Sequence, residues 1–266
     1  MFCDIHNHIL PAVDDGAQSL DDSLRMIDQA LHAGITTLCA TPHIRSYQSE
    51  TITQEKHIAV GEMLRNELAK RDITLDLHVG CEMYYTSEFQ DLAKNTVFHY
   101  QQRNGFVLVE LPPAEAPAWF ADICFSLMMN GTKILLAHPE RNIALMRNPL
   151  VLAKYLRTGI CTQVTAGSIV GKYGKEIQEF ALRIVRSGAA TVIACDAHDT
   201  FRRPFSDIAP CYDEIATTLG TIIADRLCSE NPRAILEGGQ PYQQIFDDEA
   251  EQALLKKARK KRFLFF

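Results

Sequence analysis

The sequence predicts an α/β fold in which strands and helices alternate to form one parallel sheet or barrel. Strand-like and helix-like stretches follow one another with short turn segments between them, as in βα units. The apolar runs Val107–Val109, Ile134–Leu136 and Val192–Ala194 are typical of strands that are buried on both faces. A (β/α) barrel needs roughly 250 residues, so it would use most of this chain of 266.

The first half of the chain predicts four strands and two helices. The helix over Leu20–Ala33 has Ser19 as its N-cap candidate and Gly34 as its stop. In order, the predicted elements are strand Phe2–His8, helix Leu20–Ala33, strand Ile35–Ala40, helix Thr53–Lys70, strand Leu75–Gly80 and strand Gly105–Leu111.

The second half continues the alternation after a turn-rich segment that contains Pro112, Pro113 and Pro117. Its predicted elements are helix Trp119–Asn130, strand Lys133–Ala137, helix Leu150–Arg157, strand Cys161–Thr165, helix Lys175–Ser187 and strand Thr191–Cys195. No strong internal repeat or linker divides the sequence, so we expect a single domain.

The composition is that of an ordinary globular protein, because hydrophobic residues make up 47% of the chain and provide a sizeable core. The net charge of -6 argues against a broad nucleic-acid surface, which needs clustered positive charge. No signal-peptide pattern is evident, and no apolar run approaches the ~18 residues of a membrane span. The eight cysteines are scattered without a CxxC pair, so we expect reduced thiols in a cytoplasmic protein.

Four histidine-bearing motifs lie at the ends of predicted strands. They are residues 4–8 (DIHNH) with 14–16 (DDG) behind them, residues 40–43 (ATPH), residues 137–141 (AHPER) and residues 195–198 (CDAH). Alternate side chains of a strand share a face, so His6 and His8 point the same way, and Asp196 and His198 repeat this geometry. In a barrel this position is the C-terminal rim, where catalytic residues gather. Imidazole and carboxylate groups on one rigid surface predict a divalent-metal site.

Two carboxylates, Glu82 and Glu110, extend this set, since each stands at the end of an apolar strand. A buried carboxylate is costly unless charged partners or a metal meet it. The candidate ligands are then His6, His8, one of the pair Asp14 and Asp15, His43, Glu82, Glu110, His138, Asp196 and His198. So many nitrogen and oxygen ligands are too many for one ion and suit two or three.

The order DxHxH…DDG, TPH, GxE, VE, AHPER and DxH resembles the PHP (polymerase and histidinol phosphatase) superfamily. Within it, DIHNHILPAVDDG together with AHPER is similar to the bacterial tyrosine-protein phosphatases of the capsular polysaccharide type. The resemblance runs from Phe2 to Pro204 and continues weakly through residues 231–233. It implies a distorted TIM-like (β/α)7 PHP barrel over residues 1–246, followed by a basic helical tail over residues 247–266.

The resemblance also implies that all nine candidates are ligands of a trinuclear metal centre. It places Asp15, which directly precedes Gly16, among the ligands and leaves Asp14 in a supporting position. Glu110 fills a place that other members of the superfamily give to histidine. The family often uses manganese, and the ligand chemistry also allows Fe, Co, Zn or Mg.

The charge of such a centre fits a phosphate substrate. Four carboxylates and three divalent ions leave a charge of about +2, which matches a phosphomonoester of about −1.5 to −2. A metal-activated hydroxide is the expected nucleophile. We expect Arg141 to bind the phosphoryl oxygens through its planar fork, with Arg203 and Arg45 as further candidates. The sequence does not identify the general acid. Asp199 and bound water are candidates, and a tyrosinate of pKa about 10 can also leave with metal help alone.

Residues 39–45 (CATPHIR) match the C-x5-R spacing of cysteine-dependent tyrosine phosphatases. Those enzymes bind phosphate through a glycine-rich loop of backbone N–H groups. This segment has no glycine, and Pro42 removes a donor at its centre. His43 already belongs to the metal motif, so we predict that Cys39 is not a nucleophile.

The leading hypothesis is therefore a metal-dependent protein-tyrosine phosphatase that hydrolyses phosphotyrosine. The resemblance implies that its partner is the tail of a bacterial tyrosine autokinase that controls capsule or exopolysaccharide synthesis. One alternative is another PHP phosphoesterase, acting on histidinol phosphate, another small metabolite or nucleic acid. A second is a non-catalytic, metal-binding regulatory subunit. The basic and then aromatic residues 256–266 predict either a solvated helix end or docking to an acidic membrane face or a partner kinase.

Overall fold

The computed structural model describes residues 1–44, 50–102 and 105–256. Its nine described strands form two sheets, and each pairing between strands is parallel. The three-stranded sheet has the order β1-β2-β4, and the six-stranded sheet has the order β3-β5-β6-β7-β8-β9. The strands are β1 (Phe2–Asn7), β2 (Ile35–Ala40), β3 (His43–Ile44), β4 (Asp76–Val79), β5 (Glu82–Tyr84), β6 (Phe106–Glu110), β7 (Lys133–Ala137), β8 (Cys161–Thr165) and β9 (Val192–Ala194).

Two of the predicted strands continue from one sheet into the other. β2 leads into β3, and β4 leads into β5, with a break of two residues in each case. The pairing persists through the breaks, because Gly80 N donates to Ala40 O at 2.8 Å and Glu82 N donates to Pro42 O at 3.1 Å. The nine segments therefore occupy seven strand positions, and the predicted α/β class with parallel strands is confirmed. β3 and β5 were not predicted, because runs of two or three residues carry no periodicity.

Hydrogen bonds also join β1 to the segment after β9, so the seven positions form a ring. Asp196 N donates to His6 O at 2.8 Å, and His8 N donates to Ala197 O at 2.8 Å. The ring is therefore held together at the end where the strands finish. This is the end that carries the histidine motifs.

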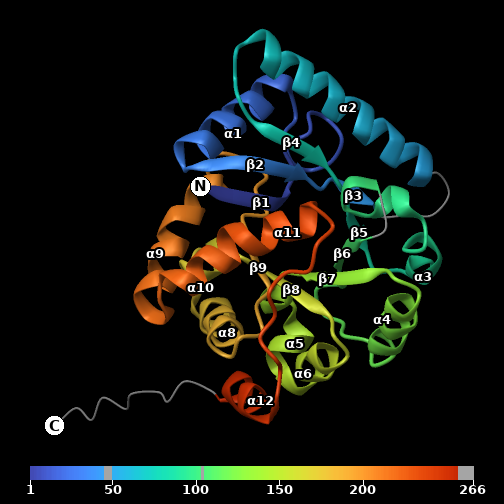
Figure 1. The fold of residues 1–266 in the computed structure, drawn as a ribbon, viewed down its shortest axis with the longest axis vertical. Coiled ribbons are helices and arrows are strands. Elements are labelled where there is room, and N and C mark those ends of the chain that lie inside the picture. The colour runs from blue at the N-terminus through green and yellow to red at the C-terminus, as the bar shows by residue number, and fades with distance from the viewer. Residues whose placement is uncertain (45–49, 103–104, 257–266) are drawn as a thin grey trace.

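The interior of the ring is filled by inward-facing strand residues. Ile5, Leu108 and Leu135 belong to this buried cluster, and so do Ile235 and Leu236 of α11 (Asn231–Leu236). In Figure 1, α11 crosses in front of the strands. This helix closes the end at which the strands begin, so the opposite end is free to hold a site.

The remaining helices surround the strands (Figure 1). Their bounds are α1 (Leu20–His32), α2 (Glu50–Lys70), α3 (Phe89–Leu92), α4 (Phe120–Met129), α5 (Ile143–Arg147), α6 (Pro149–Arg157), α7 (Ala166–Ile169), α8 (Lys175–Arg186), α9 (Ile208–Leu219), α10 (Thr221–Asp225) and α12 (Asp248–Leu255). The five predicted helices lie within three residues of their expected bounds. Ser19 caps α1 as expected, because its side chain accepts a hydrogen bond from Asp22 N at 3.2 Å.

The C-terminal segment is described only as far as residue 256. α12 lies inside the range predicted for the helical tail, and Arg157 of α6 pairs with Glu251 at 2.8 Å and with Asp248 at 2.6 Å. The basic and aromatic residues 257–266 lie outside the described residues. In the part of the chain that is described, no helix has both the length and the apolar character that a membrane crossing requires.

Candidate metal centre

All nine predicted ligands come together where the strands end. His6 lies in β1 and His8 and Asp15 follow it, His43 begins β3, Glu82 begins β5, Glu110 ends β6, His138 follows β7, and Asp196 and His198 follow β9. Their ligand atoms form four overlapping groups in which the atoms lie within 4.8 Å of one another: His8, Asp15, His43 and His198; His6, His138 and Asp196; His6, His8 and Glu82; and His43, Glu82 and Glu110. Each side chain is carried by a strand end or the loop after it, so a rigid sheet positions the cluster.

Glu82 lies at the centre of the cluster and is 1% exposed. Its Oε2 atom lies 3.1 Å from His43 Nδ1, 3.3 Å from His6 Nε2 and 3.5 Å from His8 Nε2. Its other oxygen, Oε1, lies 3.0 Å from His138 Nε2. One carboxylate thus faces four imidazoles and would be among the residues that hold divalent ions.

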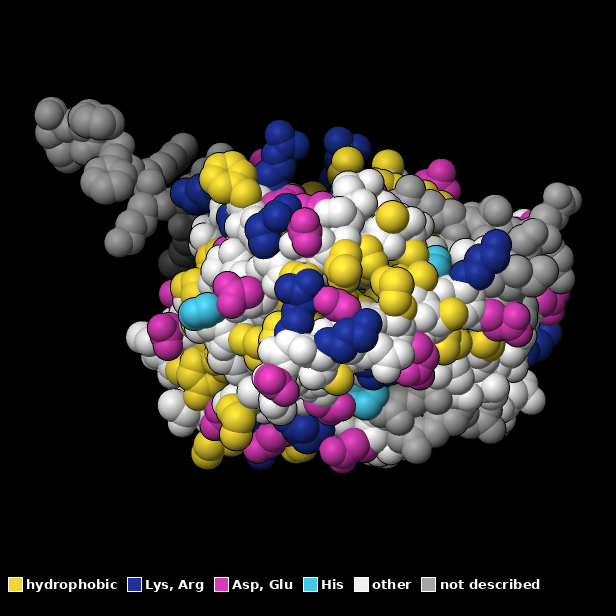
Figure 2. Space-filling model, turned by 90° about the horizontal axis from the view of Figure 1, so that it is seen from above, with side chains coloured by type: hydrophobic (Ala, Val, Ile, Leu, Met, Phe, Trp, Pro, Cys, Tyr) yellow, Lys and Arg dark blue, Asp and Glu magenta, His cyan; other side chains and the backbone are white. Residues whose placement is uncertain are grey.

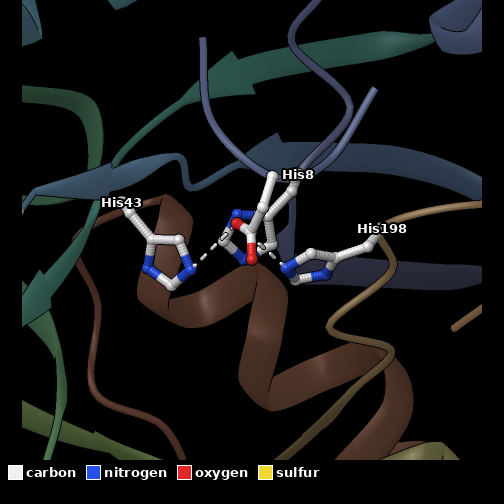
Figure 3. Close-up of side chains that lie close together, drawn as sticks. His8, His43 and His198 are labelled. Carbon is white, nitrogen blue, oxygen red and sulfur yellow. Dashed lines mark ion pairs between the residues drawn. The ribbon is translucent and has the colours of Figure 1, made fainter. Parts of the chain in front are cut away.

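Asp15 occupies the outer side of the cluster, with 51% of its side chain exposed. Its Oδ1 atom lies 3.3 Å from His43 Nε2 and 3.6 Å from His198 Nε2. Figure 3 shows the rings of His8, His43 and His198 gathered around this carboxylate group. The tight turn requires Gly16, because a Cβ atom there would lie 2.0 Å from His8 O.

Two site residues have unusual backbone conformations. His138 has a φ angle of 29° and Asp196 has a φ angle of 49°. Positive φ is disfavoured for residues with a Cβ atom, and such residues cluster at functional sites. Both residues lie where the chain leaves a strand. The strained backbone at these two positions sets the direction of the side chains.

The cluster contains polar atoms that the protein does not satisfy. Five buried atoms have ion-pair contacts of 3.1–3.6 Å with carboxylate or imidazole groups but no hydrogen bond of suitable geometry, namely His6 Nε2, His8 Nε2, His43 Nδ1, His198 Nε2 and Glu82 Oε2. Buried polar groups are normally paired, so a facing set of such atoms without hydrogen bonds has the character of ligands for a divalent ion. Nitrogen and carboxylate oxygen donors of this kind fit a divalent transition metal.

The charges of the cluster are strongly coupled. Burial would raise the pKa of Glu82, but the charge of His6 and neighbouring hydrogen bonds hold it well below its usual range. Burial likewise opposes ionisation of Asp196, yet Arg141 holds the pKa of this carboxyl well below its usual range. Burial lowers the pKa of His198 to about 3. Burial would lower the pKa of His6 and His8, but Glu82 and Asp196 raise that of His6, and the hydrogen bond to Asp14 raises that of His8. The acids are thus held ionised by positive neighbours, and bound divalent ions would take over this role.

Outer hydrogen bonds fix the orientation of the imidazoles. His6 Nδ1 donates to Gln163 Oε1 at 2.9 Å, and the same oxygen accepts from His138 N at 3.2 Å. His8 Nδ1 donates to Asp14 Oδ2 at 2.7 Å. In each ring the Nε2 atom is thereby left to face the cluster. Asp14 thus hydrogen-bonds a histidine of the cluster and belongs to none of the four ligand groups.

Two further buried acids support the site and were not predicted. Asp4 Oδ2 accepts from Cys195 N at 2.6 Å, which ties β1 to the end of β9. Glu140 Oε1 accepts from Thr165 N at 2.9 Å and from Ser168 Oγ at 2.7 Å. Both lie inside the motifs DIHNH and AHPER, so their place in the motifs was the available signal. Their partners are distant in the chain, and the sequence alone does not identify them.

Both described phosphate candidates lie at the edge of the cluster. Arg141 Nη1 contacts Asp196 Oδ2, and Arg203 Nη1 lies 3.2 Å from the same oxygen. Arg203 Nη2 also lies 4.0 Å from Asp15 Oδ2. The guanidinium of Arg141 lies 5.6 Å from the ring centre of Tyr173, and this cation–π contact stabilises its position. Arg45 lies outside the described residues.

The structure does not support Asp199 as a general acid. Its Oδ1 atom accepts backbone hydrogen bonds from Phe201 at 2.6 Å, from Arg202 at 2.5 Å and from Arg203 at 3.4 Å. Burial would raise the pKa of Asp199, but these three bonds lower it. An ionised side chain that is already occupied by backbone donors is a poor proton donor, so its role is to hold the turn.

Two cavities that can admit a ligand lie beside the cluster. A hollow of about 520 Å³ is lined by Val13, Asp14, Asp15, Gln18 and His43. A smaller cavity of about 70 Å³ is lined in part by Glu110, His138 and Arg141. The cluster is therefore reachable by a ligand from the side of Asp15.

Replacing Cys39 with serine should leave phosphatase activity within about twofold of the wild type. Cys39 is 0% exposed, and burial raises the pKa of its thiol well above the usual range, so it is not an available thiolate. Initial rates on an aryl phosphate check this expectation. A large loss of activity with an intact fold and full metal content would reinstate cysteine catalysis.

Comparison with known proteins identifies the family of the chain. A family model described as capsular polysaccharide synthesis, CpsB/CapC, matches residues 2–237. The tyrosine-protein phosphatase YwqE of Bacillus subtilis (strain 168) is 35% identical over 205 residues, which cover 76% of this chain and 79% of the relative.

Solved structures give the same picture. A chain from the crystal structures of YwqE from Bacillus subtilis and CpsB from Streptococcus pneumoniae, called unique metal-dependent tyrosine phosphatases, matches with a TM-score of 0.83 at 32% identity. The match covers 91% of this chain and 97% of that chain. β-Aspartyl dipeptidase from Fervidobacterium islandicum AW-1 matches with a TM-score of 0.56 at 12% identity, over 91% of this chain and 77% of that chain, and shares the fold alone. The chain therefore belongs to the CpsB/CapC family of capsular polysaccharide synthesis.

Proposed function

We propose that this protein is a metal-dependent protein-tyrosine phosphatase that hydrolyses phosphotyrosine monoesters. The observation that carries the proposal is the cluster of nine nitrogen and oxygen ligands with two arginines at its edge. The ligands suit divalent ions, and the guanidinium groups suit a phosphoryl group. The names of YwqE and CpsB as tyrosine phosphatases support the identity of the substrate.

We assign the nine side chains as ligands of three divalent ions, with manganese as the metal and Fe, Co, Zn or Mg as alternatives. The four overlapping ligand groups support more than one ion. When bound, such ions supply positive charge to the phosphoryl group and a nucleophile at neutral pH.

The chain's own residues bind and orient the substrate. Arg141 and Arg203 contact the same oxygen of Asp196, so both guanidinium groups lie at the same edge of the cluster. From this edge they bind the phosphoryl oxygens. The hollow beside Asp15 and His43 takes the tyrosine ring. Water protonates the leaving tyrosinate, whose pKa of about 10 makes a dedicated acid dispensable.

We propose the phosphotyrosine tail of a bacterial tyrosine autokinase as the partner, in the control of capsule or exopolysaccharide synthesis. The family description supports a role in capsule synthesis. We place the reaction in the cytoplasm, which suits eight free cysteines. In this proposal residues 1–246 carry the activity, and residues 247–266 make a peripheral contact with the kinase or the membrane.

Nucleic acid is not a proposed partner. Among the described side chains of the face shown in Figure 2, basic and acidic groups are interspersed. A nucleic-acid surface would instead gather basic side chains into a patch or stripe. The net charge of -6 points the same way.

The test compares metal-loaded protein on a phosphotyrosine peptide, histidinol phosphate and single-stranded DNA. We expect the phosphotyrosine peptide to have the highest kcat/KM, chelation to abolish its hydrolysis, and added Mn²⁺ to restore it, because the ligand cluster is inert without ions. Preference for histidinol phosphate would overturn the substrate. Hydrolysis that survives chelation would overturn the metal dependence.

A further inference from the structure

The turn between His198 and Arg203 presents an aromatic side chain to solvent. Phe201 is 84% exposed, and the neighbouring Arg202 is exposed as well. Single exposed apolar residues are common, so exposure alone has no functional meaning. The structure adds two facts about Phe201, namely how firmly its backbone is held and how close it stands to the cluster.

The turn is fixed by hydrogen bonds from the rest of the fold. Asp199 Oδ1 accepts from the backbone N–H groups of Phe201 and Arg202, and Gln29 Nε2 of α1 donates to Thr200 O at 3.0 Å. The backbone that carries the aromatic ring is therefore ordered before any partner arrives. A pre-ordered contact loses little conformational freedom on binding, which favours affinity.

The turn also stands directly beside the phosphate-binding edge. Phe201 is two residues from Arg203, so their Cα atoms lie within about 7.6 Å of each other. Arg203 contacts Asp196 and Asp15 of the cluster. Peptide residues are spaced by ~3.3–3.6 Å in an extended chain, so near neighbours of a bound phosphotyrosine come within reach of this turn.

Arg202 adds a charge to this surface. Its backbone N–H group donates to Asp199, and no described residue forms an ion pair with its guanidinium. An exposed aromatic ring next to an uncompensated positive charge is complementary to a peptide segment that has apolar and acidic side chains.

We propose that Phe201 and Arg202 form a docking site for the polypeptide that flanks the phosphotyrosine. Phe201 packs against an apolar side chain of the substrate, and Arg202 pairs with an acidic one. This inference rests on the proposed function and sharpens it: the substrate class is a phosphotyrosine within an acidic and apolar peptide segment rather than a free aryl phosphate.

The test uses the full-length, metal-loaded protein and the double variant Phe201→Ala/Arg202→Ala. Two substrates are compared, p-nitrophenyl phosphate and a phosphotyrosine peptide with Leu and Glu beside the phosphotyrosine. We expect KM for the peptide to rise by about tenfold in the variant, as for loss of an interface anchor. Both kinetic constants for p-nitrophenyl phosphate should stay within about twofold, since this substrate does not reach the turn.

The matched control is Phe125→Ala/Arg147→Ala, which removes an exposed Phe of α4 and an exposed Arg of α5. It should leave KM for both substrates unchanged. A second peptide with Gln in place of Glu isolates the charge: it should raise KM for the wild type and have little effect on the double variant.

The outcomes separate the two levels of the proposal. Equal KM values for the peptide in wild type and variant would overturn the docking site and leave the phosphatase assignment intact. Parallel losses on both substrates would also overturn it, because the turn would then only support Arg203. A wild-type protein that hydrolyses p-nitrophenyl phosphate but not the peptide would overturn the proposed function, and the docking site with it.

Discussion

Replacing Glu82 with glutamine should abolish phosphatase activity, because the oxygens of this one carboxylate lie within 3.5 Å of four site histidines. Glutamine keeps the size of the side chain but removes the negative charge that a shared metal ligand supplies. We expect metal content to fall and kcat/KM on a phosphotyrosine peptide to drop by more than about 100-fold. Elemental analysis of the purified variant and initial-rate measurements check both expectations.

A matched control for this change is Glu115→Gln, at an exposed position outside the cluster. It should keep both metal and activity. Metal ions also stabilise a protein by binding its folded state, so the rise in melting temperature on adding Mn²⁺ should be present in the control and lost in Glu82→Gln. Full metal content together with wild-type activity in Glu82→Gln would contradict the assignment of Glu82 as a ligand.

Replacing Arg141 with alanine should lower kcat by ~10²–10³-fold while the metal content stays at the wild-type level, as for loss of a donor to the transition state. Arg141 lies at the edge of the cluster, contacts Asp196 and stacks against Tyr173, so its planar fork is held in place before substrate binds. Single-turnover rates and metal analysis on the same preparation separate loss of chemistry from loss of metal.

Arg141→Lys provides a graded comparison, since it keeps the charge but loses the two-pronged hydrogen bonding. Its activity should lie between those of the alanine variant and the wild type. Arg147→Ala, at an exposed position of α5, is the matched control and should behave as wild type. If Arg141→Ala lost metal in proportion to activity, Arg141 would be a support for Asp196 rather than a phosphate-binding group.

Local patterns in the sequence were sufficient to predict the residues that gather in the cluster. His6 and His8 alternate in a strand, and Glu82, Glu110 and His138 follow or end apolar runs, so each was marked by its own neighbourhood. The ends of parallel strands meet at one rim, which is why separate local signals combine into one cluster. The same reasoning accounts for the seven strand positions around the ring.

Contacts that depend on the closed ring were not predictable in this way. Which histidines Glu82 faces is decided by the stagger of neighbouring strands, and the partners of Asp4 and Glu140 lie far away in the chain. Asp199 shows a different limit of prediction from the sequence. It stands next to a ligand in the sequence, but the direction of three backbone N–H groups in the turn decides what its carboxylate does.

The hydrogen bonds that join β1 to the segment after β9 have a consequence for when the centre comes into being. His6 and His8 emerge early in synthesis, whereas Asp196 and His198 emerge only after the last strand of the ring. Two of the four ligand groups contain Asp196 or His198, so these groups stay incomplete until the last strand of the ring has been made, and we expect full occupancy by ions to wait for the complete ring. Once bound, the ions stabilise the closed form, because binding and folding draw on the same free energy. We therefore expect full metal content only in chains whose ring of strands is closed.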